Sequence, residues 1–136
     1  MFGKEGLIQL KTKVQLALAA AADRKADDPV ALNLKGIATF TDCFVIVAGG
    51  QRRQTQAICD AIIERLGEKG QRPGHVEGYE LGDWILMDFA DMVVHVFTHE
   101  TRTFYGLENL WGDAPRMNLE SAQSRRNRGA SAARKG

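Results

Sequence analysis

The stretch CFVIVAGGQRRQTQAICDAIIERLGEKG, which runs from Cys43 to Gly70, predicts the class of fold. Its first six residues are apolar without alternation and rich in β-branched side chains, as in a strand buried on both faces of a sheet. After Gly49 and Gly50, apolar residues recur at the three- and four-residue steps of an amphipathic helix, and Gly70 is a typical helix stop. A buried strand that leads through a short turn into a helix is typical of α/β domains.

The flanking segments extend this pattern. Upstream, apolar residues at helical spacing predict a helix from Leu7 to about Asp23, and the alternation in VALNLK predicts a half-buried strand over residues 30–35. Downstream, we expect an extended piece at 75–77, two strands within 83–97, and one or two helical turns in HETRTFYGLENLW. The order α, β, β, α, β, β, β, α predicts an α/β fold in which helices flank a mixed β-sheet.

The stretch DWILMDFADMVVHVF, residues 83–97, contains three aspartates and a histidine, so it is a candidate catalytic or metal site. If Ala90 and Asp91 form a two-residue turn, one wholly apolar face of the hairpin points toward the core. The other face then carries Trp84 and sets Asp88 diagonal to His95, close enough for a structural hydrogen bond. The core-face pairs are Phe89 with Met92, Met87 with Val94 and Ile85 with Val96; the others are Asp88 with Val93, Leu86 with His95 and Trp84 with Phe97.

This register spreads the acids over a turn, a sheet face and a strand end, so we expect no catalytic pair of carboxylates. The second face, with Trp84, Leu86 and Phe97 beside Asp88, would be an apolar patch with an acidic rim unless a helix covers it. A covering helix and a docking surface for another protein are both open at this point. The aromatic residues that follow within fifteen positions would extend a docking surface: Phe104, Tyr105 and Trp111.

Metal and anion sites are disfavoured. The three histidines are His75, His95 and His99, and the last two lie roughly 13 Å apart if they share a strand. Cys43 and Cys59 sit in other elements and are interpreted as small buried thiols. The Gly-Gly turn has neither GxGxxG nor P-loop spacing, so a structural turn is favoured over a phosphate site. We predict no metal, no cofactor and no catalytic residue.

Composition and charge bound the class of protein. The chain has 136 residues, 44% of them hydrophobic and 26% charged, and no apolar run long enough for a bilayer. MFGKEG leads into no secretory signal, so we expect a cytoplasmic protein without a membrane contact. Residues 116–136 contain six basic residues and one acid, which leaves 12 basic and 16 acidic residues in 1–115. This predicts an acidic α/β domain over 1–115 and a basic, disordered tail over 116–136.

Three motifs resemble those of one known family in order and spacing: TDCFVIVAGGQRRQTQAICDAI, VEGYELGDWILMDFADMVVHVF and ETRTFYGLENLWGDAP. The family is Iojap, the ribosomal silencing factors (RsfS), and the resemblance runs from about residue 10 to Pro115. It implies a fold akin to nucleotidyltransferases without demonstrated transferase chemistry. It also implies binding to the large ribosomal subunit, at the ribosomal protein numbered fourteen, which blocks joining of the small subunit and represses translation under nutrient limitation.

The resemblance also implies a contact surface. The tryptophan that opens the family's W-x-x-x-D strand matches Trp84, and the tyrosine of its FY-x-L segment matches Tyr105. The flanking apolar and acidic positions match Ile85, Asp88 and Leu107. Two partner contacts are further alternatives: the tail could touch ribosomal RNA through its basic residues, and an apolar docking face could pair with itself in a homodimer.

The chain departs from the family pattern at two positions. Gln51 replaces the serine that follows the Gly-x pair, which removes a helix N-cap worth about 1 kcal/mol. The same change removes the Gly-Ser pair of true nucleotidyltransferases, which weakens the alternative reading as a nucleotidyltransferase-like nucleotide-binding enzyme. Ala90 replaces the glycine of the family turn D-x-G-D, and alanine tolerates a positive φ less well than glycine.

Overall fold

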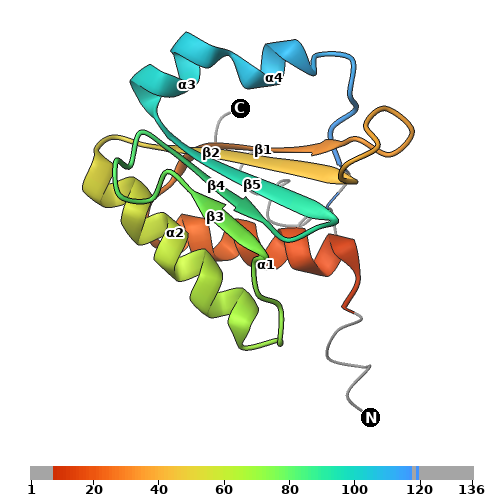
Figure 1. The fold of residues 1–136 in the computed structure, drawn as a ribbon, viewed down its shortest axis with the longest axis horizontal. Coiled ribbons are helices and arrows are strands. Elements are labelled where there is room, and N and C mark those ends of the chain that lie inside the picture. The colour runs from red at the N-terminus through yellow and green to blue at the C-terminus, as the bar shows by residue number, and fades with distance from the viewer. Residues whose placement is uncertain (1–7, 118, 120–136) are drawn as a thin grey trace, which may run out of the picture.

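The structure, a computed structural model, describes residues 8–117 and residue 119. A five-stranded sheet with the strand order β1-β2-β5-β4-β3 forms its middle layer, with α1 and α2 on one face and α3 and α4 over the other (Figure 1). The elements are α1 (Leu10–Asp23), β1 (Asp27–Asn33), β2 (Cys43–Gly49), α2 (Arg52–Gly67), β3 (His75–Glu77), β4 (Trp84–Asp88), β5 (Met92–Thr98), α3 (His99–Tyr105) and α4 (Leu107–Leu110).

The sheet is mixed, as predicted. The central strands β2 and β5 run parallel, whereas β1, β4 and β3 pair antiparallel with their neighbours. All seven residues of β2 are buried, which confirms the central strand. The parallel pairing aligns Cys43 with Met92 and Gly49 with Thr98, so the Gly-Gly turn and the start of α3 lie at the same end of the sheet.

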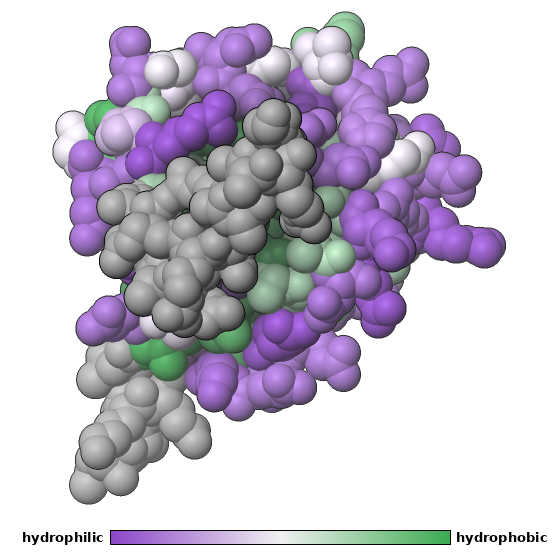
Figure 2. All heavy atoms as spheres, turned by 180° about the vertical axis from the view of Figure 1, so that it is seen from behind, coloured by the Kyte–Doolittle hydropathy of each residue, from purple (hydrophilic) through white to green (hydrophobic). Residues whose placement is uncertain are grey.

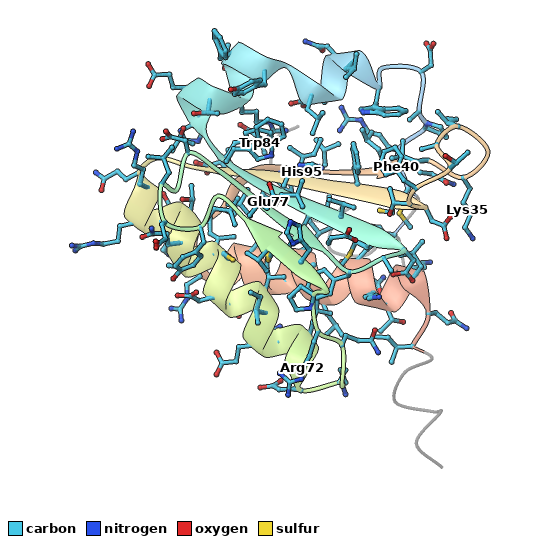
Figure 3. The ribbon with its side chains drawn as sticks, in the orientation of Figure 1. Lys35, Phe40, Arg72, Glu77, Trp84 and His95 are labelled. Carbon is cyan, nitrogen blue, oxygen red and sulfur yellow. The ribbon has the colours of Figure 1, made fainter. Side chains whose placement is uncertain are left out.

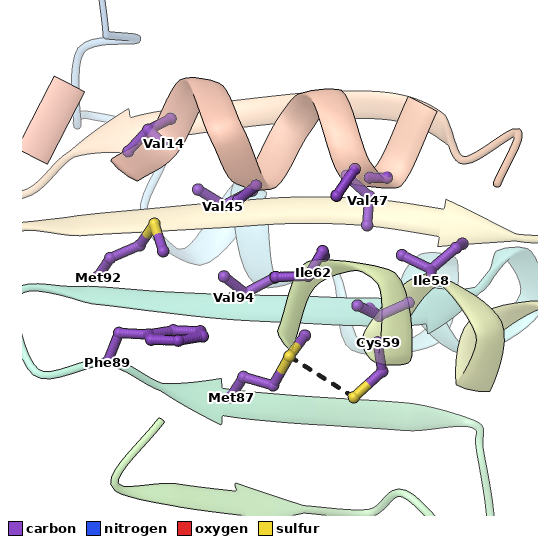
Figure 4. Packing of buried hydrophobic residues seen from close by; sticks show 14 of the residues in the cluster. Val14, Val45, Val47, Ile58, Cys59, Ile62, Met87, Phe89, Met92 and Val94 are labelled. Atoms are coloured by element: carbon purple, nitrogen blue, oxygen red, sulfur yellow. Dashed lines mark hydrogen bonds between the residues drawn. The ribbon is translucent and has the colours of Figure 1, made fainter. Parts of the chain in front are cut away.

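The larger core lies between the sheet and the pair α1 and α2. Val45 and Val47 of β2 meet Ile58 and Ile62 of α2 there, and all four are 0% exposed (Figure 4). The thiol Sγ of Cys59 lies 3.6 Å from the Sδ of Met87. Both cysteines are buried, as predicted, and burial raises the pKa of each thiol to about 12. They therefore stay protonated and act as small apolar side chains.

A second core fills the space between the other face of the sheet and α3 and α4. Phe44, Ile46 and Phe97 are buried in it, while Trp84 and Leu107 are half-buried at its border. The covering helices are therefore present, but they leave the border of this face partly open to solvent.

The first strand differs from its prediction. β1 covers Asp27–Asn33 rather than 30–35, because a register irregularity between Asp27 and Val30, with Asp28 at φ 51°, lets the pairing with β2 start early. The side-chain oxygen of Asn33 accepts a hydrogen bond from the Lys35 backbone N–H at 3.0 Å, which turns the chain out of the sheet. α1 begins at Leu10 in the described part of the chain, and Leu7 lies outside that part.

The hairpin of β4 and β5 has the predicted register at all five of its paired positions, from Trp84 with Phe97 to Asp88 with Val93. The turn also forms, with Ala90 at φ 76° and a hydrogen bond from the Asp91 N–H to the Phe89 carbonyl at 3.1 Å.

The predicted bond between Asp88 and His95 is wrong. The carboxylate Oδ1 of Asp88 accepts from the Ala90 N–H at 2.8 Å, since a donor two residues ahead in a turn is closer to hand than one across the strands.

The folded domain extends past Pro115. Leu32 and Arg116 form an antiparallel bridge, and the Met117 N–H donates to the Ala31 carbonyl at 2.9 Å. Met117 and Leu119 pack against the larger core. The predicted domain boundary at residue 115 is therefore too early, because apolar side chains continue beyond it. Disorder was predicted for the tail over residues 116–136, of which 118 and 120–136 lie outside the described part.

Candidate functional site

Trp84 and Tyr105 meet at the border of the second core. Trp84 opens β4, Tyr105 ends α3, and their ring centroids are 4.8 Å apart. Figure 3 shows Trp84 between the sheet and α3. Tyr105 is 54% exposed and its neighbour Phe104 is 80% exposed, with the two rings edge to face at 5.0 Å. We call Trp84, Phe104 and Tyr105 the aromatic cluster.

Local hydrogen bonds place α3 over the sheet. Thr98 is its N-cap, and its hydroxyl accepts from the Thr101 N–H at 3.3 Å. Gly106 ends α3 in the left-handed conformation, at φ 56°, and α4 starts immediately after it. A left-handed residue at this position is most easily a glycine. The short helix is thus fixed at both ends, with Tyr105 at its last position.

An arginine ties the two short helices to the sheet. The Arg102 guanidinium donates to both carboxylate oxygens of Glu108, at 2.8 and 3.0 Å, and to the Asp28 carbonyl at 2.7 Å. The hydrogen bond from Arg102 lowers the pKa of Glu108. Two-point pairing of this kind fixes relative orientation as well as distance. The aromatic cluster is therefore held by a built-in clamp between α3, α4 and β1.

The five residues that the resemblance assigns to the contact surface do not all lie together. Trp84 and Tyr105 are in contact, and Leu107 is half-buried in the adjoining core. Asp88 is half-buried at the far end of β4, four residues and roughly 13 Å along the strand from Trp84. Ile85 is 0% exposed and belongs to the core on the opposite face of the sheet. The structure does not bring Ile85 to this surface, because side chains alternate along a strand.

Two residues around the second core were missed. Phe40 lies before the first residue of β2, at the end of the sheet away from Trp84, and His95 lies beside Trp84. Phe40 is 59% exposed and contacts Phe44 and Trp111, with ring centroids 5.9 and 6.1 Å away; it lies in a loop, where no periodicity marks it. His95 accepts a hydrogen bond from Trp84. The predicted register sets His95 diagonal to Trp84 as well as to Asp88, so the signal was present.

The Gly-Gly turn opens onto a cleft of about 590 Å³ lined by Arg52, Arg53 and Asp83 among others. Arg52 there is paired with the Asp83 carboxylate at 2.8 Å, which raises the pKa of the guanidinium. Asp42 and Asp91 flank the starts of β2 and β5, at the end of the sheet opposite to the turn. Asp42 and Asp91 therefore do not reach the turn. A Mg²⁺-dependent nucleotidyl transfer would require at least two carboxylates that converge there.

Metal sites and membrane-spanning helices have no support in the described ranges. Residues 8–117 and 119 contain no group of three or more His, Cys, Asp and Glu side chains placed to hold a metal ion. Within the same residues, none of the helices combines the length and the apolar character needed to cross a membrane.

Comparison with known families gives a clear match. The profile of the family described as "Ribosomal silencing factor during starvation" matches residues 8–136. The "Ribosomal silencing factor RsfS" of Halalkalibacterium halodurans is 45% identical over 111 residues, which cover 82% of this chain and 95% of the relative. That of Bacillus subtilis is 40% identical over 110 residues, 81% of this chain and 93% of the relative. A protein named "Protein Iojap, chloroplastic" from Arabidopsis thaliana is 36% identical over 108 residues.

Solved structures agree with the fold. A crystal structure from Chromobacterium violaceum has a TM-score of 0.76 at 29% identity and covers 86% of this chain and 98% of its own. One from Bacillus halodurans has a TM-score of 0.68 at 42% identity, over 76% of this chain and 94% of its own. The similarity thus extends over the sheet and the helices on both of its faces.

Proposed function

Because the chain belongs to the family of ribosomal silencing factors, we propose that it binds the large ribosomal subunit and blocks joining of the small subunit. The proposed partner is the ribosomal protein numbered fourteen, and the proposed outcome is repression of translation in the cytoplasm under nutrient limitation. The role is regulatory and not enzymatic. The observation that carries the proposal is the contact between half-buried Trp84 and exposed Tyr105 at the border of the second core.

The chemistry of the aromatic cluster suits protein docking. Tyrosine and tryptophan contribute disproportionately to binding energy at interfaces, above all where surrounding contacts exclude water. Tyr105 and Phe104 offer exposed ring surface, and Trp84 anchors them to the sheet. The acidic excess of residues 1–115 favours a basic partner through complementary charge. Leu107 and Asp88 lie at the margins of the proposed contact, and Ile85 is excluded from it.

A homodimer is proposed only as a competing use of the same aromatic cluster. On the side seen in Figure 2, polar residues predominate among the coloured atoms, and apolar ones gather beside the grey atoms. The exposed rings of Phe104 and Tyr105 are the proposed place for a second copy. A dimer formed there would have to open before the ribosomal partner could bind.

The test is co-sedimentation of the full chain with purified large ribosomal subunits. We expect Trp84→Ala and Tyr105→Ala each to weaken binding by about 2 kcal/mol, roughly thirtyfold. Phe40→Ala is the matched control, since Phe40 is an exposed aromatic residue that precedes the start of β2, at the end of the sheet away from Trp84. Thermal unfolding establishes that each variant is folded. Wild-type affinity of both site variants would refute the site, and no binding by the wild type would refute the function.

A further inference from the structure

The indole of Trp84 is hydrogen-bonded to a buried histidine. Trp84 Nε1 donates to His95 Nδ1 at 3.0 Å. Since Trp84 pairs with Phe97 and Leu86 pairs with His95, the two residues are diagonal neighbours on one face of the hairpin. The bond therefore joins the aromatic cluster to β5, a central strand whose first six residues are buried.

The acceptor is held firmly. His95 is 3% exposed, with Phe44 edge-on to its ring at 4.5 Å and Phe97 nearly parallel to it at 6.1 Å. Because Nδ1 accepts the indole N–H, it carries no proton, and in the neutral ring the proton is then on Nε2. Burial lowers the pKa of His95 to about 4. The imidazole is accordingly neutral throughout the physiological pH range, and Nδ1 stays unprotonated and able to accept the hydrogen bond from Trp84.

The other ring nitrogen of His95, Nε2, makes no comparable hydrogen bond. The buried Nε2 of His95 has no hydrogen-bond partner among the described residues. A buried donor without a partner destabilises a fold, whereas an apolar ring of similar shape would not. Stability alone would favour phenylalanine at this position, between Phe44 and Phe97. What a histidine adds there is the acceptor for Trp84.

We propose that His95 is a positioning residue for docking, which holds the Trp84 indole against Tyr105 in the orientation that the partner binds. The inference rests on the proposed function, in which Trp84 is a contact residue. Without the acceptor, the indole would lose its fixed orientation and would have to be ordered at the moment of binding. Ordering one such side chain costs affinity by about two- to tenfold.

Two substitutions separate positioning from stability. His95→Phe keeps a ring of similar size and removes the unpaired Nε2 donor, but it also takes the acceptor from the half-buried Trp84 indole N–H, so its melting temperature should stay near that of the wild type. His95→Asn keeps an acceptor at the δ position but leaves a cavity, so its melting temperature should fall. The first readout is solvent exchange of the Trp84 indole N–H by NMR. Trp84→Phe and Trp111→Phe assign the two indole signals.

If His95 positions Trp84, the variants His95→Phe and His95→Asn should rank in opposite orders for stability and for binding. In His95→Phe the Trp84 indole N–H should exchange at least about tenfold faster, and large subunits should bind about two- to tenfold more weakly. In His95→Asn, measured below its melting temperature, both should stay near the wild type. Slow exchange and wild-type binding in His95→Phe would overturn the inference. If Trp84→Ala also binds as wild type, the proposed contact fails, and the exchange rate alone decides whether His95 orients the indole.

Discussion

At the scale of single residues, His95 makes the stability of the protein depend on pH. Burial lowers its pKa to about 4, whereas in the unfolded chain it titrates near 6.5. The stability that a neutral His95 gives is fully present above pH 6.5, where the imidazole is neutral in both the folded and the unfolded state. It is lost as pH falls toward 4, because the unfolded chain binds a proton that the folded protein does not. The full difference is roughly 3 kcal/mol.

We predict that His95→Phe flattens this dependence. Between pH 7 and pH 5, the free energy of unfolding of the wild type should fall by about 2 kcal/mol more than that of the variant. Urea unfolding at the two pH values measures the difference. His75→Asn is the control, because the His75 side chain is 58% exposed, and it should follow the wild type. Parallel pH curves for His95→Phe and wild type would contradict the assignment.

The outcome at Ile85 and Trp84 shows what sequence can establish about single residues. The predicted strand pairing already put Ile85 on the core face, and the structure follows that pairing rather than the resemblance. Trp84 and Tyr105 were assigned to a contact surface through the resemblance; their rings touch in the structure, and their role in binding stays a prediction. The bond from Trp84 to His95 was not predicted, because the register offers His95 two diagonal partners. The choice depends on a local turn, in which the Ala90 N–H takes up Asp88.

At the scale of elements, α2 lacks a side-chain cap at its first turn. Gln51 is the N-cap residue and makes no side-chain hydrogen bond to the helix. We predict that Gln51→Ser raises the free energy of unfolding by about 1 kcal/mol, because a serine hydroxyl can accept from the second or third helical N–H. Chemical denaturation measures the gain. Gln51→Ala, which has no capping oxygen, should show none, and an equal gain in both variants would point to another cause.

The approach to β4 requires a glycine at position 78. Gly78 has φ 79°, and a Cβ on it would lie 2.0 Å from the Trp84 carbonyl oxygen. Gly36 has the same φ with nothing within 4 Å of its Cβ position, so it is a matched control. We predict that Gly36→Ala costs about 1 kcal/mol, from the backbone conformation alone. Gly78→Ala should cost at least about 2 kcal/mol more in the free energy of unfolding. Equal costs would show that the chain moves aside at Trp84.

Elements were predictable where one periodicity dominates. The buried run of β2, the stripe of α2 and the alternation in β4 each specify one type of element, and the structure has all three. The placement of α3 and α4 was not predictable from periodicity, since helices of seven and four residues have no full amphipathic stripe. Their position depends on the clamp of Arg102 on Glu108 and on the left-handed Gly106.

At the scale of the whole molecule, the chain beyond Pro115 has two parts. Residues 116, 117 and 119 belong to the fold: the Met117 N–H bonds to the Ala31 carbonyl, and the Leu119 carbonyl accepts from the Gln15 side chain at 3.0 Å. The remaining residues, 120–136, carry five basic side chains and one acid. A truncation after Pro115 would therefore remove core contacts and charge together, and it could not test the proposed contact of the tail with ribosomal RNA.

A truncation after Leu119 separates the two effects. We predict that it melts within about 2 °C of the full chain, whereas truncation after Pro115 melts several degrees lower because Met117 and Leu119 leave the core. If the basic residues contact RNA phosphates, the shorter chain should bind large subunits more weakly than the full chain. This loss of affinity should be larger at 50 mM than at 200 mM salt, so the affinity of the shorter chain should depend less steeply on salt. Replacing the five basic residues by glutamine in the full-length chain should reproduce that loss. If the shorter and the full chain bind with equal affinity at each salt concentration, the RNA contact is excluded, and the aromatic cluster remains the proposed source of binding.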